Sequence, residues 1–288
     1  MNVARRAEDL EPARRSVAIG TFDGVHRGHR RVLEAARVAH LRAAVVTFDP
    51  HPRAVLGGEV ELLATIGRRL ELLEEAGVED VLLLRFDEAL ASLAPEEFAE
   101  SVLRRAGAEA VAAGETFRFG HRRSGDLDLL ERLGFDVRRV PLVESTSSSH
   151  IRSLLAVGDV VHAAQLLGRP AEVEGVVVTG DGRGRNLGFP TTNLAVPEGL
   201  LVPADGVYAG AALGWPAAIS IGTNPHFGGR ERRVEAHLLD VDEDLYGRRV
   251  VVELWERLRD QASFGSEEEL VAAIAADVAR TRTARRPD

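Results

Sequence analysis

The stretch Ile19-Gly20-Thr21-Phe22-Asp23-Gly24-Val25-His26-Arg27-Gly28-His29 decides the fold of the first half. An apolar run, residues 17–19, leads into it, and a helical pattern, residues 30–42, follows it. A strand, a glycine-containing turn and a helix N-terminus form an anion site, because free backbone N–H groups point outward there. Two histidines can donate hydrogen bonds to phosphate oxygens, and Gly28 lets a polyphosphate approach the backbone. The stretch predicts a phosphate-binding turn; the alternative is a surface turn with two chance histidines.

Apolar strand patterns alternate with helical patterns through the first half. We expect strands at residues 16–22, 43–48, 80–86, 108–113 and 136–141, and helices at 30–42, 66–76, 95–106 and 126–133. This alternation favours βαβ units, in which helices cover both faces of a parallel sheet. Ligands of such sheets bind beyond the carboxyl ends of the strands, where the histidine-containing turn is placed.

The pattern changes near residue 168. Residues 151–167 predict helix with a break at Gly158-Asp159, and Gly168-Arg169-Pro170 ends it. Short strands with little helix between them follow, at residues 171–179, 206–213, 216–221, 234–240 and 249–259. They favour an antiparallel barrel or sandwich. One helix closes the chain, with a possible capping box at Ser266 and Glu269. We therefore expect domains at residues 1–168 and 169–288.

The composition limits the classes of function. A net charge of −9 disfavours nonspecific binding to nucleic acid. All 36 basic residues are arginine, so lysine cannot contact phosphate in this chain. Cysteine is absent, which excludes disulfides and cysteine-ligated metal. The sequence has no apolar run long enough to span a membrane, and its N-terminus lacks the apolar segment of a signal peptide. A cytoplasmic enzyme without a membrane partner is expected.

The run GTFDGVHRGH, residues 20–29, resembles the HxGH signature of the nucleotidyltransferase superfamily. In its full length it resembles the N-terminal module of bacterial bifunctional riboflavin kinase/FMN adenylyltransferases, also called FAD synthetases. The resemblance implies a Rossmann-like α/β nucleotidyltransferase fold. It further implies that His26 and His29 are catalytic, and that ATP is bound by Gly20, Phe22, Asp23 and Gly28.

Further motifs of the first half follow the family's order. The run TFDPHP, residues 47–52, comes after the second expected strand, and residues 114–120 resemble the family's flavin-phosphate loop. The resemblance assigns flavin binding to Thr116, Arg118 and Asp126, with Thr116 standing where the family usually has Asn or Asp. A surface salt bridge is the alternative role for Arg118.

Residues 147–152, SSSHIR, resemble the second nucleotidyltransferase signature, SSTxxR. The resemblance assigns phosphate binding to Ser148, Ser149 and Arg152. Ser149 replaces the usual Thr, and His150 stands where the family often has Arg. Because the hydroxyls precede an expected helix, a plain N-cap is the alternative.

The second half contains the glycine-rich run GDGRGRNLGFPTTN, residues 180–193. Its glycines let backbone N–H groups approach phosphate, although a glycine-rich hairpin also explains them. The run resembles the riboflavin kinase motif GRGxxLGFPTAN, with Thr192 in place of Ala. The resemblance assigns Mg²⁺ to Thr191 and Asn193, and ATP phosphates to Gly180, Gly182, Gly184 and Arg185.

Kinase chemistry also needs a base for the riboflavin 5′-hydroxyl. Val234-Glu235-Ala236-His237-Leu238 resembles the family's strand that carries this carboxylate, which makes Glu235 the candidate. Glu235 and His237 share one face of an alternating strand, and an exposed polar strand face is the alternative. Arg259 is a candidate flavin contact, with a barrel-edge ion pair as its alternative. His226 replaces Thr in a run that resembles GTNPTF.

The expected protein is a two-domain enzyme that converts riboflavin to FMN and FMN to FAD. ATP is the co-substrate of both steps, Mg²⁺ is the cofactor, and pyrophosphate leaves in the second step. One alternative is a riboflavin kinase with a weakened adenylyltransferase domain. It is motivated by the three departures from the family pattern at Thr116, Ser149 and His150. A flavin sensor without catalysis and an unrelated cytidylyltransferase are the other two.

Overall fold

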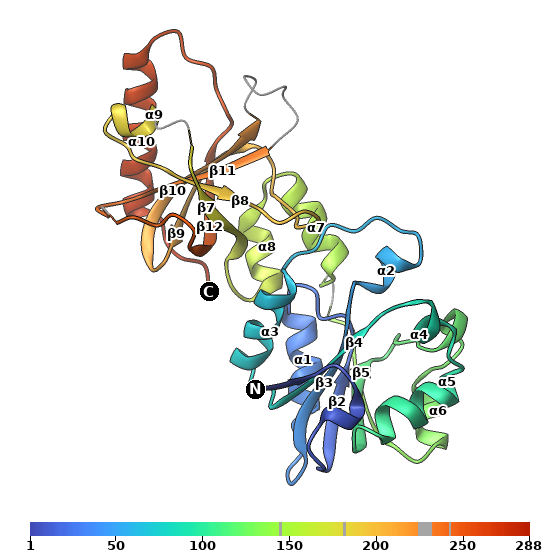
Figure 1. Ribbon diagram of the computed structural model, residues 1–288. Helices are drawn as coiled ribbons and strands as arrows, with labels where there is room; N and C mark the ends of the chain where they lie inside the picture. Colours follow the sequence, from blue (N-terminus) through green and yellow to red (C-terminus); the bar gives the residue numbers. More distant parts are fainter. Residues whose placement is uncertain (144–145, 181–182, 224–231, 242) are drawn as a thin grey trace. The chain divides into compact units, whose positions relative to one another are not determined.

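The computed structural model describes residues 1–143, 146–180, 183–223, 232–241 and 243–288 (Figure 1). The chain forms two compact units: unit 1 comprises Met1–Val60 and Ile66–Thr146, and unit 2 comprises Glu61–Thr65 and Ser147–Asp288. The domain boundary expected between residues 168 and 169 stays a prediction. Within the described ranges, no helix has both the length and the apolar character that crossing a membrane requires.

Unit 1 is built on a six-stranded sheet in which every neighbouring pair of strands is parallel. Its strands are β1 (Asn2–Ala4), β2 (Arg15–Ile19), β3 (Arg42–Asp49), β4 (Asp80–Arg85), β5 (Ala108–Gly114) and β6 (Asp136–Val140), in the order β1-β4-β3-β2-β5-β6. The expected α/β parallel sheet is confirmed. The sequence missed β1, a three-residue edge strand in which only Ala4 is buried.

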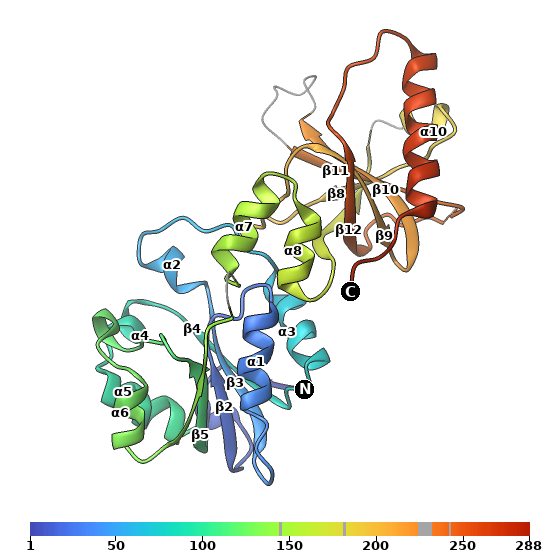
Figure 2. The ribbon, with the colours of Figure 1, turned by 180° about the vertical axis from the view of Figure 1, so that it is seen from behind.

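Helices cover both faces of this sheet (Figures 1 and 2). One face carries α1 (Arg27–Ala35) and α3 (Ile66–Glu75); the other carries α4 (Glu88–Ser92), α5 (Pro95–Phe98), the π-helix η2 (Ala99–Arg104) and α6 (Leu127–Arg132). Side chains alternate along β2, so Val17 and Ile19 pack in one apolar core while Ala18 packs in the other. The cores hold the carboxyl ends of β2 and β3 rigidly between two helical layers.

Two expected helices differ from the structure. The helix predicted at residues 30–42 instead begins at Arg27 and ends at Ala35. The chain turns beyond this end, and His40 adopts a left-handed φ of 65°. The helix predicted at residues 95–106 is divided into α5 and η2. Both differences concern helix ends and hydrogen-bond pattern, which apolar periodicity specifies weakly.

Unit 2 contains a closed six-stranded barrel in the order β10-β11-β8-β7-β12-β9, and each neighbouring pair is antiparallel. Its strands are β7 (Ala171–Val178), β8 (Thr192–Ala195), β9 (Gly206–Ala212), β10 (Trp215–Thr223), β11 (Arg232–Leu238) and β12 (Arg249–Arg259). The expected antiparallel barrel is confirmed. The sequence missed β8, whose residues it assigned to phosphate and metal binding alone.

Three longer helices accompany the barrel. Residues of α7 (Ser148–Ala156) and α8 (Val160–Leu167) enter its apolar core, among them Ile151, Leu155 and Leu167. The expected closing helix is α10 (Glu267–Thr283), and the Ser266 hydroxyl accepts a hydrogen bond from the Glu269 N–H at 3.2 Å. Residues 61–65 also belong to unit 2, since Leu62 N–H donates to Gly199 O at 2.7 Å.

Candidate active sites

The histidine turn of unit 1 joins the carboxyl end of β2 to helix α1. His26 is the N-cap of α1, and its Nδ1 accepts a hydrogen bond from the backbone N–H of His29 at 3.2 Å. The two imidazole rings stack with centroids 3.6 Å apart and planes 12° apart. The ring of Phe22 lies against His29 at 5.2 Å. The turn therefore presents the two histidines as one rigid pair.

Glycine is needed at the position between the two histidines. A Cβ atom on Gly28 would lie 3.1 Å from Cε1 of His26 and 3.7 Å from Cγ2 of Thr146. Any side chain would thus press on the stacked rings. Thr146 directly precedes the second signature, so the chain that enters this signature passes beside Gly28.

The turn is also strained and well buried. Phe22 and Val25 adopt left-handed φ angles of 49° and 38°, which cost energy for residues other than glycine. Phe22 and Asp23 are buried, whereas Gly20 lines an adjoining cavity. Such strain persists only where the surrounding core over-determines the backbone, and it gathers at functional sites.

Burial sets the protonation state of the second histidine. The pKa of His29 lies well below its usual value of 6.5, first because burial disfavours the charged form and then because His26 and Arg69 repel a proton. Its Nδ1 atom is buried and has no hydrogen-bond partner among the described residues. A neutral imidazole keeps one N–H donor, so His29 can donate to a ligand without carrying charge.

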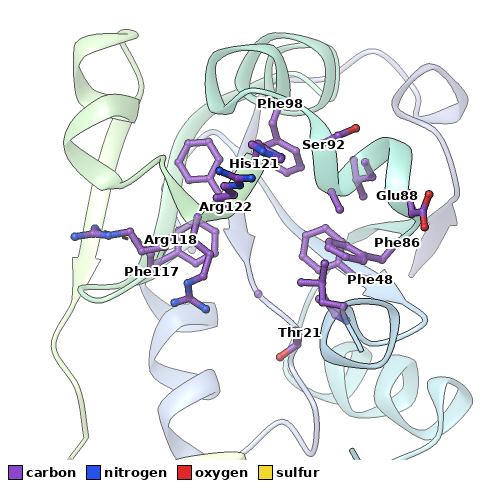
Figure 3. Close-up of a pocket in the computed structure, with 18 of the residues that line it drawn as sticks. Thr21, Phe48, Phe86, Glu88, Ser92, Phe98, Phe117, Arg118, His121 and Arg122 are labelled. Atoms are coloured by element: carbon purple, nitrogen blue, oxygen red, sulfur yellow. Dashed lines mark hydrogen bonds between the residues drawn. The ribbon is translucent and has the colours of Figure 1, made fainter. Parts of the chain in front are cut away.

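A cavity of about 670 Å³ opens beside His29 in unit 1 (Figure 3). Its walls are largely aromatic, formed by Phe48, Phe86, Phe98, Phe117 and Phe119. Figure 3 shows Phe117 and Arg118 on one side of the cavity and Phe48, Phe86 and Glu88 on the other. Its size and apolar walls suit a planar aromatic ligand, while the arginines at its edge suit an anionic group.

The three predicted flavin residues of unit 1 lie close together. Thr116 and Arg118 line the cavity, and Asp126 caps α6 by accepting from the N–H of Leu129 at 2.9 Å. The guanidinium of Arg118 approaches Asp126 at 3.7 Å. Arg118 therefore forms the surface ion pair that was its alternative role and also borders the cavity. Flavin binding by these residues stays a prediction.

The second signature lies at the start of α7, in unit 2. Ser147 is its N-cap and accepts from the His150 N–H at 3.2 Å, so the capping role expected for this run belongs to Ser147. Ser148 and Ser149 form the first turn of the helix. Arg152 donates through Nε to the carbonyl oxygen of Glu61 at 2.6 Å. Phosphate binding by Ser148, Ser149 and Arg152 stays a prediction.

The predicted kinase residues meet on the outer face of the barrel. Glu235 lies opposite Asn193 of β8 and opposite Ser220 of β10 in the strand register. The side chains of Val234 and Ala236 are fully buried inside, so Glu235 and His237 share the outer face, as expected. A carboxylate and an amide oxygen donor are thus neighbours on adjacent strands.

The glycine-rich run approaches these residues closely. A Cβ atom on Gly180 would collide with the Asn193 side chain, and one on Gly184 would collide with the carbonyl oxygen of Phe189 and lie 3.3 Å from Oγ1 of Thr191. Arg185 is exposed in the short helix α9 (Arg183–Asn186). Gly182, also predicted to bind phosphate, and His226 lie outside the described residues.

The Thr192 hydroxyl, absent from the kinase motif, is used within the barrel. It donates to the carbonyl oxygen of Ala236 at 3.0 Å. Thr192 pairs with Ala236 and Asn193 pairs with Glu235, so the two side chains leave β8 on opposite faces. The extra hydroxyl therefore points away from the candidate metal residues.

Arg259, the candidate flavin contact, is held at the end of β12. Its guanidinium forms an ion pair with the buried Asp277 of α10 at 2.8 Å and lies 5.6 Å from the centre of the Phe264 ring. This is the ion pair named as its alternative role. A flavin contact by Arg259 stays a prediction.

Comparisons with known proteins identify a family for each part of the chain. A family model described as FAD synthetase matches residues 9–154, and one described as riboflavin kinase matches residues 167–285. The relative in Escherichia coli (strain K12), a bifunctional riboflavin kinase/FMN adenylyltransferase, is 37% identical and covers 91% of this chain and 90% of its own. The chain belongs to this bifunctional family.

Other relatives extend the match. The protein of the same name in Pseudomonas fluorescens is 36% identical over 100% of this chain and 99% of its own. The Bacillus subtilis (strain 168) protein is 33% identical and covers 93% of this chain and 91% of its own. Among solved structures, one described as a macrolide-efflux protein from Streptococcus pneumoniae shares 33% identity and a TM-score of 0.88, covering 97% of this chain and 98% of its own.

Sequence reasoning placed His237 beside Glu235 but gave it no role, and it did not single out Arg69. His237 Nδ1 contacts the Pro190 carbonyl oxygen at 2.7 Å, and its ring meets Phe189 edge-on at 5.6 Å, which fixes the glycine-rich run to β11. Arg69 of α3 is buried behind the histidine turn. The alternation of β11 indicated the orientation of His237, whereas no signal in the sequence distinguished Arg69 from a surface arginine.

Proposed function

We propose that this bifunctional riboflavin kinase and FMN adenylyltransferase carries out its two reactions at separate groups of residues. The outer face of the barrel around Glu235 phosphorylates riboflavin, and the histidine turn with its adjoining cavity adenylylates FMN. The observation that carries this assignment is the stacked His26–His29 pair, of which His29 lines an aromatic cavity. Both steps consume ATP, and we place them in the cytoplasm, where ATP is made and used.

Adenylyl transfer requires alignment of two anions and stabilisation of charge on the α-phosphorus of ATP. The FMN phosphate attacks this phosphorus, and pyrophosphate leaves. His26 and His29 donate hydrogen bonds to the phosphate oxygens, and backbone N–H groups at the start of α1 add further donors. The phenylalanine walls take the flavin ring, while Thr116 and Arg118 orient its phosphate. Ser148, Ser149 and Arg152 bind the leaving phosphates.

Phosphorylation of riboflavin requires removal of the proton from its 5′-hydroxyl as the γ-phosphoryl group of ATP is transferred. Glu235 accepts this proton. The backbone of the glycine-rich run binds the phosphates of ATP, and the lack of side chains at Gly180 and Gly184 lets this run pack closely against Asn193 and Thr191. Arg185 supplies positive charge to the ATP phosphates, and Arg259 contacts the flavin.

The donor set beside Glu235 fits magnesium. Thr191 and Asn193 offer a hydroxyl and an amide oxygen, the hard ligands that Mg²⁺ prefers. Within the described residues, no group of three or more His, Cys, Asp or Glu side chains is arranged to hold a metal ion. Few protein ligands suit an ion that usually keeps several waters and binds substrate phosphates. When bound, Mg²⁺ would offset negative charge on the ATP phosphates.

One assay tests the proposal. The purified chain is incubated with riboflavin, ATP and Mg²⁺, and the flavins are separated by chromatography. We expect FMN followed by FAD, and FMN supplied alone should also yield FAD. Formation of FMN without FAD would instead indicate a kinase with a weakened adenylyltransferase, and bound flavin without turnover would indicate a sensor.

A further inference from the structure

Two Thr-Phe-Asp segments lie side by side at the carboxyl edge of the sheet in unit 1. Thr21-Phe22-Asp23 follows β2, and Thr47-Phe48-Asp49 ends β3. The strands pair in parallel up to Ile19 and Val46, and the Thr47 hydroxyl donates to the carbonyl oxygen of Thr21 at 3.1 Å. The pairing brings two carboxylates to the edge where a polyphosphate is to bind.

Arg69 of helix α3 reaches the carboxyl end of β3. Its side chain is 2% exposed, and Nη1 donates to the carbonyl oxygen of Phe48 at 3.1 Å. Burial lowers the pKa of Arg69, while the carboxylates of Asp23 and Asp49 act in the opposite direction. The Nε atom is buried without a hydrogen-bond partner in the described part of the chain. Arg69 is thus held at this edge with its hydrogen-bonding capacity only partly used.

Arg15 is a structural arginine of the same unit, and its exposed fraction equals that of Arg69. It lies at the opposite, amino edge of the sheet and donates to Asp80 at 2.8 Å, to Ala106 O at 2.9 Å and to Glu11 O at 2.7 Å. Arg69 makes one such hydrogen bond, although burying a charge is costly unless it is well paired. The contrast indicates that Arg69 is retained for the electrostatics of the ligand edge.

We propose that Arg69 is a positioning residue of the adenylyltransferase, whose buried guanidinium at the carboxyl end of β3 offsets the negative charge of Asp23 and Asp49 so that ATP polyphosphate binds at this edge. The inference rests on the proposed function of unit 1. Like charges at a binding site oppose association, so loss of the Arg69 charge beside these two carboxylates would weaken ATP binding. The guanidinium removes that repulsion without touching the substrate.

The charge of Arg69 also acts on His29. The charged and titratable groups that act on His29 are His26, the N-cap of α1, and Arg69 of α3. Burial, His26 and Arg69 together lower the pKa of His29. Removing the Arg69 charge therefore raises the pKa of His29, and the acidic limb of the adenylyl-transfer pH profile should move to higher pH.

The experiment measures FMN-to-FAD conversion by the full-length chain carrying Arg69→Met, Arg69→Lys or Arg15→Lys. For Arg69→Met we expect the KM for ATP to rise about tenfold or more and the acidic limb to move to higher pH. Arg69→Lys keeps the charge and should restore most of both. Arg15→Lys should lower the unfolding temperature of the chain without changing either readout.

The double variant Arg69→Met/Asp49→Asn tests the charge directly. Removing one of the carboxylates should bring the KM for ATP back toward the wild-type value. An unchanged KM for ATP and an unchanged pH profile in Arg69→Met overturn the proposal. A raised KM that neither the added Asp49→Asn change nor the replacement Arg69→Lys relieves also overturns it. If Arg69→Met does not fold, Asp49→Asn alone decides: a lower KM for ATP supports the proposal, and an unchanged KM overturns it. Absence of FAD formation by the wild-type chain would instead reject the function proposed for unit 1.

Discussion

The stacked histidines join two properties that rarely occur together in exposed side chains. In the role proposed for them they donate hydrogen bonds to phosphate, while burial lowers the pKa of His29 and favours its neutral form. A neutral donor binds phosphate by hydrogen bonds and loses no proton when the pyrophosphate departs. The sequence predicted both histidines, because HxGH after a strand is a local pattern. It could not predict Arg69, whose role depends on the packing of α3 against turns some twenty to fifty residues away.

Replacing His29 by alanine tests this pair. We expect the rate of FMN-to-FAD conversion to fall by about 100- to 1000-fold, the usual cost of losing one transition-state donor. Formation of FMN by the same preparation should continue at the wild-type rate. His162→Ala is a matched control, since His162 is an exposed histidine of α8 that pairs only locally with Asp159. Wild-type FAD formation by His29→Ala would contradict the role given to the signature.

Replacing Glu235 by glutamine removes the candidate base while keeping the size of the side chain. Phosphorylation of riboflavin should slow by about 100- to 10,000-fold, the range that a well-placed base contributes. FMN-to-FAD conversion should survive, which makes this variant the reciprocal of His29→Ala. Initial rates of each step, measured with riboflavin or with FMN as substrate, provide the check. Equal loss of both steps would argue against two separate sites.

At the scale of elements, strands with strong apolar patterns were predictable and short ones were not. The expected strands of unit 1 correspond to β2 through β6, because a buried parallel strand is an apolar run of several residues. β1 and β8 escaped prediction, since three or four residues carry no periodicity. β8 matters for function, because its pairing with β11 places Asn193 beside Glu235.

The amino ends of β2 and β4 are joined by the buried ion pair of Arg15 and Asp80, whose side chains are 2% and 1% exposed. Asp80→Asn should lower the free energy of unfolding of unit 1 by about 3–5 kcal/mol, because it leaves a buried guanidinium uncompensated. Glu109→Gln is the control, since it breaks the exposed pair of Glu109 with Arg14. This second change should leave stability nearly unaltered. Urea unfolding compares the variants, and equal destabilisation by both would refute the assignment.

At the scale of the whole molecule, each compact unit holds one of the two groups of residues proposed to be catalytic. His26 and His29 belong to unit 1, and Glu235, Thr191 and Asn193 belong to unit 2. Unit 2 also includes α7, which carries the second nucleotidyltransferase signature, and its apolar side chains enter the barrel core. A signature of the first reaction is therefore part of the folded body of the second. Sequence patterns could not anticipate this, because they place α7 next to the first-half elements that precede it.

Two fragments test where the kinase body begins. The fragment of residues 169–288 lacks α7 and α8, and thereby loses the core residues Ile151, Leu155, Val160, Ala163 and Leu167. Fully burying one such side chain contributes about 1.5–3 kcal/mol for the larger residues, so the loss approaches the 5–15 kcal/mol by which typical domains are stable. We expect the fragment of residues 147–288 to unfold cooperatively and form FMN, and the shorter fragment to unfold at a much lower temperature or aggregate. Equal unfolding temperatures, measured by circular dichroism, would place the boundary at residues 168 and 169 and make the two helices dispensable for the barrel.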